Sequence, residues 1–401
     1  MALVWANSPW RESYESLWAT KVSISAGRFS IAQDLHHWVN DGLMVLFFFV
    51  VGLEIKRELV VGELNDVRKA MLPAFGALGG MVVPALIFAA FNLGGAIEGW
   101  GIPMATDIAF AVGVLALLGR RVPVGLKVFV LSLAIVDDIG AIAVIALFYS
   151  SGIELWWLLV SVFGLMLVAI LRRVRVLWVP VYVVIGSGVW LAMLNSGVHA
   201  TIAGVALGLM APARPTDPEG FEDVAEATSS LSQEPDAESV RSLTLQTKEV
   251  VSVAERLEHL LHPWTSFLVI PLFALANAGV ALDAQGFRSA LASPVTMGVA
   301  TGLVVGKIVG ISGMSWLALR LRLGELPIGV SLRHLIGGAA VAGIGFTVSL
   351  FISILAFPGE ELQTVAKIGV MLGSVVAATV GIAVLLREAS NEGSAGRRLR
   401  T

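Results

Sequence analysis

The sequence predicts an all-α polytopic membrane protein with about 11 full transmembrane helices and a helical stub at the N-terminus. Its 401 residues are 56% hydrophobic and only 14% charged, a balance that soluble domains rarely show. Apolar runs of about 17 to 25 residues, long enough to cross a bilayer, recur along the chain. The 42 glycines are typical of closely packed membrane helices. Cysteine is absent, which excludes disulfides and thiol chemistry.

The sequence predicts a short N-terminal segment, a β-hairpin and then a series of apolar spans. Residues 1–10 are too short to span a membrane and lack the basic start of a signal peptide. Residues 21–32 predict a β-hairpin, because apolar and small residues alternate on both sides of Ala26-Gly27. The apolar spans then lie near residues 35–57, 71–92, 102–119, 124–149, 155–171, 176–194, 199–211, 262–281, 294–318, 334–356 and 363–386.

Basic residues gather at every second connection between these spans, and the other connections carry few. The positive-inside rule therefore predicts that the basic connections and the C-terminus, including the tail 388–401, lie in the cytoplasm. The basic positions are Lys56, Arg57, Arg68, Lys69, Arg120, Arg121, Arg172, Arg173, Arg175, Arg320, Arg322, Arg387, Arg397, Arg398 and Arg400.

Residues 212–255 depart from the pattern of the remaining chain, which we expect to form one transporter domain over residues 1–401. This segment is acidic, rich in proline and serine, and poor in large apolar residues. Such a composition predicts a disordered cytoplasmic loop. It is compatible with a regulatory insert or with a tolerated surface insertion.

Two adjacent carboxylates, Asp137 and Asp138, lie in the middle of LSLAIVDDIGAIAVIALF, a run with no other charge. A carboxylate at the bilayer centre is expensive, so it usually faces a cavity, a partner or a transported ion. Helical neighbours point about 100° apart, so one carboxylate can face a cavity while the other meets a neighbouring helix. An ion site at which Na⁺ and protons compete is the favoured interpretation, with a purely structural pair as the alternative.

The spans 102–119 and 199–211 are short or interrupted by glycine and proline, which indicates discontinuous helices. In the first of them, Thr106-Asp107 precedes a new apolar run and resembles a helix N-cap. That geometry fits either a helix broken at an ion site or an ordinary cap at the bilayer edge.

Three further features lie inside or at the ends of spans. Lys307 stands alone in an apolar, glycine-rich run and needs a carboxylate partner, unless it reaches the surface. Gly343 and Gly345 can unwind a helix or form a packing notch. Charged and titratable residues near span ends could respond to pH or serve only as structural groups: Glu54, Arg57, Glu58, His199 and Glu258.

These segments, in this order, resemble the bacterial NhaA-type sodium/proton antiporters from about residue 36 to residue 387, without the acidic segment. The matching stretches are FFFVVGLEIKREL, GIPMATDIAFAVGVLALLG, LAIVDDIGAI, NSGVHATIAG, RLEHLLHPW, PLFALANAGV, GKIVGIS and GIGFTVSLFI. The resemblance implies inverted repeats and two discontinuous helices that cross near the membrane midplane. It also implies a multi-pass protein of the bacterial cytoplasmic membrane, rather than an enzyme, that uses no cofactor and binds no nucleic acid.

The resemblance implies roles for individual residues. Asp138 would be the principal carboxylate for Na⁺, Li⁺ or a proton, and Asp137 would alternate between the ion and Lys307. Asp107 and Thr106 would lie at one helix break, and the other break would be formed by Gly343, Gly345 and Phe346. Glu54, Arg57, Glu58, His199 and Glu258 match positions linked to pH activation. Such a protein exchanges outgoing Na⁺ for a larger number of incoming protons, and it forms a homodimer through the hairpin.

The chain departs from the family pattern in its shortened first helix and its longer acidic segment. Two other functions remain open at this stage. A sodium-coupled solute symporter can share broken helices, but it would not require proton exchange. An intramembrane aspartyl protease needs its two aspartates on different helices and a GxGD motif, and this sequence lacks both features.

Overall fold

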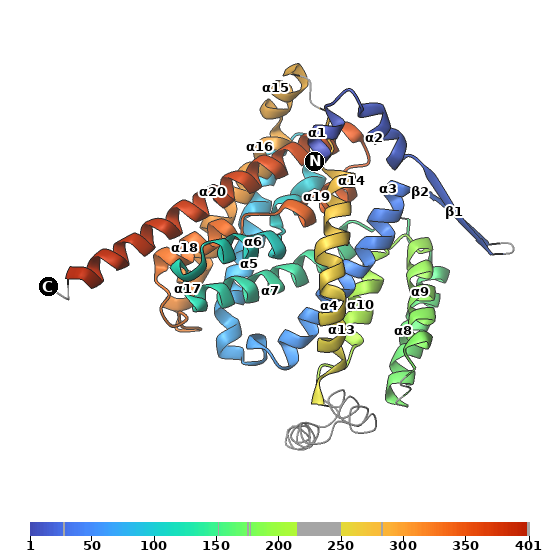
Figure 1. Ribbon diagram of the computed structural model, residues 1–401, viewed down its shortest axis with the longest axis horizontal. Coiled ribbons are helices and arrows are strands. Elements are labelled where there is room, and N and C mark those ends of the chain that lie inside the picture. The colour runs from blue at the N-terminus through green and yellow to red at the C-terminus, as the bar shows by residue number, and fades with distance from the viewer. Residues whose placement is uncertain are drawn as a thin grey trace, which may run out of the picture. The chain divides into compact units, whose positions relative to one another are not determined.

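Helices make up nearly all the regular structure of the protein, seen here in a computed structural model (Figure 1). The structure describes residues 1–26, 29–150, 152–174, 176, 178–214, 250–281 and 284–398. Within these residues, seven helices are long and apolar enough to cross a membrane, and a bent helix pair forms an eighth span. Two shorter apolar helices lie at Val179–Asn195 and Thr201–Met210. The prediction of an all-α polytopic membrane protein is confirmed.

The chain divides into two compact units. Unit 1 comprises Met1–Met44, Asp66–Gly152 and Val269–Thr401, and unit 2 comprises Val45–Asn65 and Ile153–Leu268. The helices of unit 1 are α1 (Ala2–Ala6), α2 (Arg11–Trp18), α3 (Leu35–His37), α5 (Val67–Phe91), α6 (Ile108–Leu117), α7 (Val124–Phe148), α14 (Ile270–Asn277), α15 (Ala284–Ala292), α16 (Pro294–Thr301), α17 (Lys307–Arg320), α18 (Leu332–Val341), α19 (Phe346–Ala356) and α20 (Glu360–Arg398).

Short 3-10 helices, which are tighter than an α-helix, and π-helical turns, which are wider, connect some of these helices. A 3-10 helix at Ile97–Met104 precedes α6, and π-helical turns at Gly302–Gly306 connect α16 to α17. Further short stretches of these kinds lie at Trp38–Leu43 and Gly119–Arg121. An apolar core of unit 1 lies among α5, α6, α7, α17, α18 and α20. It buries Leu72, Leu126, Phe129, Leu133, Ile311 and Leu335.

Helices α5 and α17 approach each other closely at two glycines. A Cβ on Gly79 would collide with the carbonyl oxygen of Gly310, and a Cβ on Gly310 would collide with that of Gly79. Small residues at such a crossing let two membrane helices bring their backbones into contact. The long helix α20 packs against α16 and α18 (Figure 1). These contacts fix the elements that carry the polar groups described below.

The predicted β-hairpin is present in unit 1. Strands β1 (Lys21–Ala26) and β2 (Phe29–Asp34) are antiparallel, and their register runs from Lys21 opposite Asp34 to Ala26 opposite Phe29. The connection at residues 27–28 lies outside the described residues. Asp34 ends β2 and caps α3, because its side chain accepts a hydrogen bond from the backbone N–H of His37.

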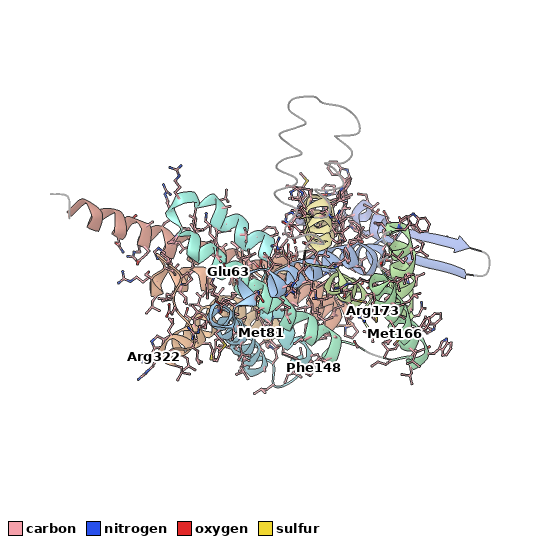
Figure 2. The ribbon with its side chains drawn as sticks, turned by 90° about the horizontal axis from the view of Figure 1, so that it is seen from below. Glu63, Met81, Phe148, Met166, Arg173 and Arg322 are labelled. Atoms are coloured by element: carbon pink, nitrogen blue, oxygen red, sulfur yellow. The ribbon has the colours of Figure 1, made fainter. Side chains whose placement is uncertain are left out.

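Unit 2 carries most of α4 (Met44–Val60), the 3-10 turn Glu63–Asn65, α8 (Leu155–Arg173), α9 (Val179–Asn195), α10 (Thr201–Met210), α13 (Val253–Trp264) and most of the π-helical turn Thr265–Val269. Helices α8 and α9 lie side by side (Figure 1). Helices α4 and α10 meet through glycines: a Cβ on Gly204 would collide with the carbonyl oxygen of Val45. Arg173 ends α8, as Figure 2 shows.

Three segments differ in detail from the sequence prediction. Residues 199–211 were expected to be discontinuous, but α10 is one uninterrupted short helix. Helix α13 begins at Val253, nine residues before the expected span, because Ser252 caps a polar first turn that hydropathy does not detect. The expected disordered loop, 212–255, falls mainly on residues 215–249, which lie outside the described residues.

Candidate functional site

Buried polar side chains gather in unit 1 where α7, α17 and two interrupted helices meet. Helix α7 contributes Asp137 and Asp138, which are 1% and 6% exposed. Thr106 and Asp107 come from the break before α6, and Lys307 is the first residue of α17. All five are buried. These five residues form the polar cluster, and they are the residues that the sequence singled out as ion-site candidates.

Lys307 and Asp137 form an ion pair at the centre of the polar cluster. The Nζ atom of Lys307 lies 2.6 Å from Oδ2 of Asp137. It also donates a hydrogen bond to Oγ1 of Thr106 at 2.9 Å. Thr106 in turn lies 2.6 Å from Oδ2 of Asp137 and 2.9 Å from the carbonyl oxygen of Ala342. Because a hydroxyl carries one proton, Thr106 donates to one of these two acceptors at a time.

The second carboxylate oxygen of Asp137, Oδ1, is buried and has no hydrogen-bond partner among the described residues. A buried acceptor without a partner is costly. A hard cation such as Na⁺ prefers oxygen ligands, and this oxygen lies on the residue next to Asp138. The polar cluster therefore offers carboxylate oxygens that suit a monovalent hard cation.

Glycines and a local change of helix geometry make room for the Lys307 side chain. The π-helical turns Gly302–Gly306 immediately precede Lys307, and such turns often occur at functional sites. A Cβ on Gly306 would lie 2.8 Å from the Cα of Pro84 on α5. Gly80, also on α5, faces the aliphatic stem of Lys307, and a Cβ there would lie 3.6 Å from Cδ of that lysine.

Asp107 caps two helices at once. Its Oδ1 accepts a hydrogen bond from the N–H of Phe110 in the first turn of α6, at 3.2 Å. Its Oδ2 accepts bonds from the N–H of Thr347 at 2.9 Å and from the hydroxyl of Thr347 at 2.5 Å, in the first turn of α19. The carboxylate thus meets the positive ends of both helix dipoles. The first-turn N–H groups of the two helices would otherwise lack acceptors.

The two helix breaks also exchange backbone hydrogen bonds. Helix α18 ends at Val341 and α19 begins at Phe346, with a bend of 50° between them. The N–H of Asp107 donates to the carbonyl of Ile344 at 2.7 Å. Gly345 lies so close to the other break that a Cβ on it would be 2.9 Å from the carbonyl oxygen of Ala105. The broken segments therefore contact each other directly, as two crossing discontinuous helices would.

Aromatic and backbone contacts support this crossing. The ring of Phe346 packs edge-on against Phe110, with centroids 5.2 Å apart. A Cβ on Gly343 would collide with the carbonyl oxygen of Leu303. The stretch between α18 and α19 therefore has no room for a side chain at this position.

The polar cluster contains more acidic than basic groups. It holds three carboxyl groups and one lysine, and all four side chains are buried. Two helix N-termini offset part of the charge of Asp107. Charged groups buried in a membrane protein usually mark an ion or proton pathway. A bound cation or proton would balance the remaining charge on Asp137 and Asp138.

The other predicted residues lie in unit 2. Arg57 and Glu258 form an ion pair, with Nη1 2.7 Å from Oε1. Arg57 also lies 3.5 Å from Glu58, whose other oxygen accepts the N–H of Glu63.

The remaining two residues are partly buried. Glu54, one helical turn before Glu58 on α4, is partly buried. His199 lies before α10 and is partly buried. The charged residues therefore form a network on α4 and α13, and His199 does not belong to it.

Sequence reasoning missed three polar partners. Thr347 binds Asp107 through its backbone N–H and its hydroxyl group. Ser374 on α20 accepts the N–H of Gly345 at 3.3 Å. Asn277 on α14 donates to Oδ1 of Asn40 at 2.8 Å, and both residues are buried. An isolated asparagine in the apolar run PLFALANAGV was the available signal for this last pair.

The fold is that of a polytopic membrane protein with a buried polar cluster between its helices. The chain belongs to the family described as Na⁺/H⁺ antiporter 1, whose model matches residues 1–385. It is 47% identical to the Na⁺/H⁺ antiporter NhaA 3 of Frankia alni over 96% of this chain and 83% of that protein. It is also 47% identical to the NhaA antiporter of Rhodopirellula baltica, over 96% and 89% of the two chains. Antiporters are secondary transporters rather than enzymes.

Proposed function

We propose that this protein is an electrogenic antiporter that exports Na⁺ or Li⁺ across the bacterial cytoplasmic membrane in exchange for inward-moving protons. The observation that carries this proposal is the buried ion pair of Lys307 and Asp137 beside Asp138, at the point where two helix breaks meet. The family membership supports the same function. The transport cycle requires no cofactor, and its substrates are Na⁺, Li⁺ and H⁺.

The ion pair provides a simple basis for exchange. Without a bound cation, the ammonium of Lys307 holds Asp137 at 2.6 Å and satisfies one of its oxygens. When Na⁺ binds to Asp138 and Asp137, the carboxylate of Asp137 leaves Lys307, and protons leave the cluster. When protons return, Na⁺ is displaced and the ion pair forms again. Because more protons than Na⁺ ions cross in each cycle, the membrane potential drives the exchange.

The helix breaks would keep the site in place during this cycle. Asp107 offsets the positive ends of α6 and α19, so the backbone at the break needs no water to satisfy it. Thr106 contacts both Lys307 and Asp137, so it can follow the change of partner. Gly343, Gly345 and Phe346 form the other break. The inverted repeats that the sequence resemblance implies remain a prediction.

We propose a cytoplasmic C-terminus, with the tail 388–401 and the loop 212–255 on the same side. The basic residues at the ends of α8 and α17 support this orientation, and Arg322 follows α17 in Figure 2. The whole chain would then act as one transporter domain. A homodimer through the β-hairpin completes the proposal. Glu54, Arg57, Glu58, His199 and Glu258 are proposed to adjust activity to pH.

The decisive experiment uses everted vesicles from a bacterial host that lacks its own antiporters. The vesicles are energised to acidify the lumen, and NaCl is added while a fluorescent dye reports the pH difference. Na⁺ should raise the luminal pH with the wild-type protein and not with Asp138→Asn. The matched control is Asp66→Asn, which removes an aspartate that caps α5 outside the polar cluster.

Two outcomes would overturn the proposal. The site assignment fails if Asp138→Asn exchanges ions at the wild-type rate. The antiport assignment fails if inserted wild-type protein gives no response to Na⁺ or Li⁺ at any pH between about 6 and 9, a range in which buried carboxylates can titrate. Electrogenicity is tested in proteoliposomes, where an imposed potassium potential should accelerate exchange. An unchanged rate would instead indicate electroneutral exchange.

A further inference from the structure

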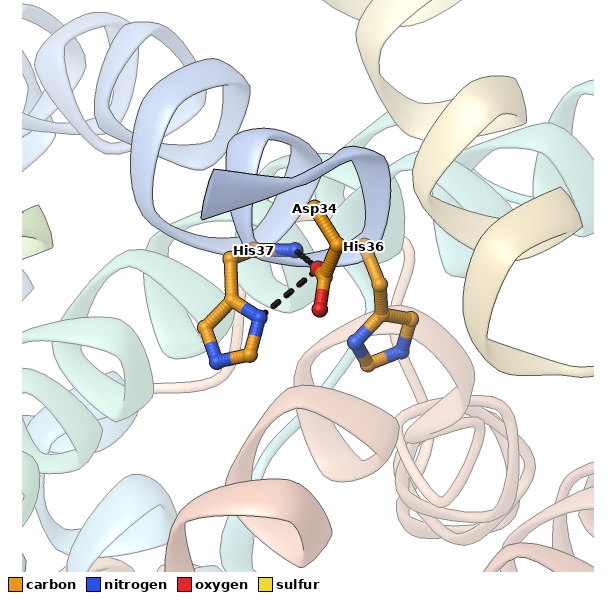
Figure 3. A group of neighbouring side chains, drawn as sticks. All are labelled: Asp34, His36 and His37. Carbon is orange, nitrogen blue, oxygen red and sulfur yellow. Dashed lines mark hydrogen bonds and ion pairs between the residues drawn. The ribbon is translucent and has the colours of Figure 1, made fainter. Parts of the chain in front are cut away.

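Three potential metal ligands lie together at the base of the β-hairpin. Asp34 is the last residue of β2, and His36 and His37 belong to α3. One ligand atom from each of the three lies within 4.8 Å of the other two. Figure 3 shows the carboxylate of Asp34 between the two imidazole rings. Among the described residues, no other group of three histidine, cysteine or carboxylate side chains is as closely spaced.

This group is separate from the polar cluster and differs from it chemically. It lies outside the seven long apolar helices, at the start of the span that the sequence predicts over residues 35–57. Its side chains are accessible: His37 is 55% exposed and Asp34 is 29% exposed. Imidazole nitrogens with one carboxylate are ligands for Zn²⁺, Cu²⁺ and Ni²⁺. Na⁺ and Li⁺ prefer oxygen ligands, so the transported ions are poor candidates for this group.

We propose that Asp34, His36 and His37 bind one divalent transition-metal ion, with Zn²⁺ as the representative ion and water completing the coordination. Three protein ligands with an open fourth position are a common arrangement for Zn²⁺. The spacing DxHH places all three ligands on one short turn, where the strand ends and the helix begins. No large rearrangement of the chain is needed to bring them to one ion.

Two of the ligands already contact each other. Oδ1 of Asp34 accepts the backbone N–H of His37 at 2.8 Å, and Nδ1 of His37 lies 2.7 Å from the same oxygen. A metal ion would take the place of the contact between this nitrogen and this oxygen and bind both side chains.

A neighbouring residue holds one imidazole in place. Nδ2 of Asn40 lies 3.2 Å from Nδ1 of His36, and Oδ1 of Asn40 accepts a hydrogen bond from Asn277 on α14. Because an amide NH₂ group only donates, this contact uses the lone pair of Nδ1, and a metal ion on His36 would displace it. Both asparagines are buried.

A bound metal would stiffen the hairpin base. Its ligands would join the end of β2, which pairs with Lys21 of β1, to the first helical turn that leads into the membrane. Hydrogen exchange of the backbone amides of residues 35–37 should therefore slow when Zn²⁺ binds, because opening of this turn would require release of a ligand.

The test measures metal binding to the full-length protein, purified in detergent through a tag without histidines. Calorimetry with Zn²⁺ should give one site per chain. Asp34→Asn, His36→Gln and His37→Gln should each weaken binding at least about tenfold. His259→Gln is the matched control, because it removes an exposed histidine of α13 and should leave binding unchanged. In parallel, Co²⁺ should develop the intense visible absorption of a site with four ligands, and His37→Gln should abolish it.

The proposal is overturned if the wild type binds no Zn²⁺ up to about 1 mM, the limit of weak association. Equal Zn²⁺ affinity in wild type and all three ligand variants would also overturn it, since the ion would then bind elsewhere. His37→Gln separates loss of the ligand from misfolding, because this side chain is mostly exposed. Its replacement should leave the elution volume of the protein in size-exclusion chromatography unchanged. Binding is measured without transport, so failure of the antiport proposal would leave this result unaffected.

Discussion

Replacing one member of the buried ion pair should destabilise the protein far more than replacing both. In Lys307→Met, the carboxylate of Asp137 loses the ammonium group that lies 2.6 Å away. The carboxylate nevertheless stays buried, because the side chain of Asp137 is 1% exposed and that of Lys307 is 0% exposed. Breaking a buried pair on one side costs about 3 to 5 kcal/mol of unfolding free energy. Asp137→Asn should cost a similar amount, because it leaves the buried ammonium without its counter-charge.

The double variant Lys307→Met/Asp137→Asn removes both charges. Replacement of a whole buried pair by neutral groups is often neutral or stabilising, so the double variant should be more stable than either single variant. The coupling free energy of the cycle should therefore amount to several kcal/mol. The pair Arg11–Glu15 provides a matched control, since its N···O distance is also 2.6 Å but its side chains are 57% and 55% exposed. Arg11→Met should cost less than about 1 kcal/mol.

The assay is unfolding of purified protein in detergent, followed by tryptophan fluorescence and by loss of the monodisperse elution peak after heating. The expected order of stability places both single variants of the ion pair below the double variant. If the single and double variants are equally stable within about 0.5 kcal/mol, the pair has no energetic role and the reasoning is wrong. Transport should be lost in the Asp137 variants whatever their stability.

The remaining predictions concern the helix breaks, the helix crossing and the N-terminal segment. Asp107→Ala should leave the two buried donors of Thr347 without an acceptor, at a cost of about 1 to 3 kcal/mol for each, and should also free the part-buried N–H of Phe110; an unchanged melting temperature would contradict the capping role. Gly310→Ala should cost about 1 to 3 kcal/mol because its methyl group meets the backbone of α5, whereas Gly113→Ala, with no atom within 4 Å, should be tolerated. Equal effects of the two glycine variants in the same melting assay would exclude a close crossing at Gly310. Burial raises the pKa of Tyr14 from 10.0 to about 12, so the stability that its hydrogen bonds to α14 contribute should be complete below pH 10 and lost as the pH rises through 12. Tyr14→Phe should lose that part of the alkaline pH dependence, and identical pH profiles for variant and wild type would refute the assignment.

The positions of the spans could be predicted from the sequence because hydropathy depends only on local composition. The lone charges in apolar runs were equally visible, since Asp137, Asp138 and Lys307 stand out from their neighbours. The residues alone could not predict which carboxylate Lys307 contacts, and only the family resemblance implied Asp137. That choice depends on the rotation of α7 about its axis, where adjacent side chains differ by about 100°. The π-helical turns before Lys307 change its direction further.

The helix breaks show the same limit of prediction from the sequence alone. Glycine and proline indicated a break near 102–119, and the break lies at Ala105–Asp107. The same signals near 199–211 indicated a break that α10 does not have. Composition alone cannot separate these cases, because glycines also serve close packing, as Gly204 does against α4. What distinguishes the segment 102–119 is the carboxylate of Asp107 at the break, which accepts hydrogen bonds from backbone N–H groups that the break leaves without a partner.

One carboxylate makes the two breaks depend on each other. A helix that ends inside a membrane leaves N–H and C=O groups that neither lipid nor water can satisfy. Here Asp107 accepts from the first turns of α6 and α19, while its own N–H donates to the carbonyl of Ile344 after α18. Each broken helix therefore supplies the partners that the other lacks. A change at Thr347 should disturb α6 as well as α19, although Thr347 lies 240 residues away from Asp107 in the sequence.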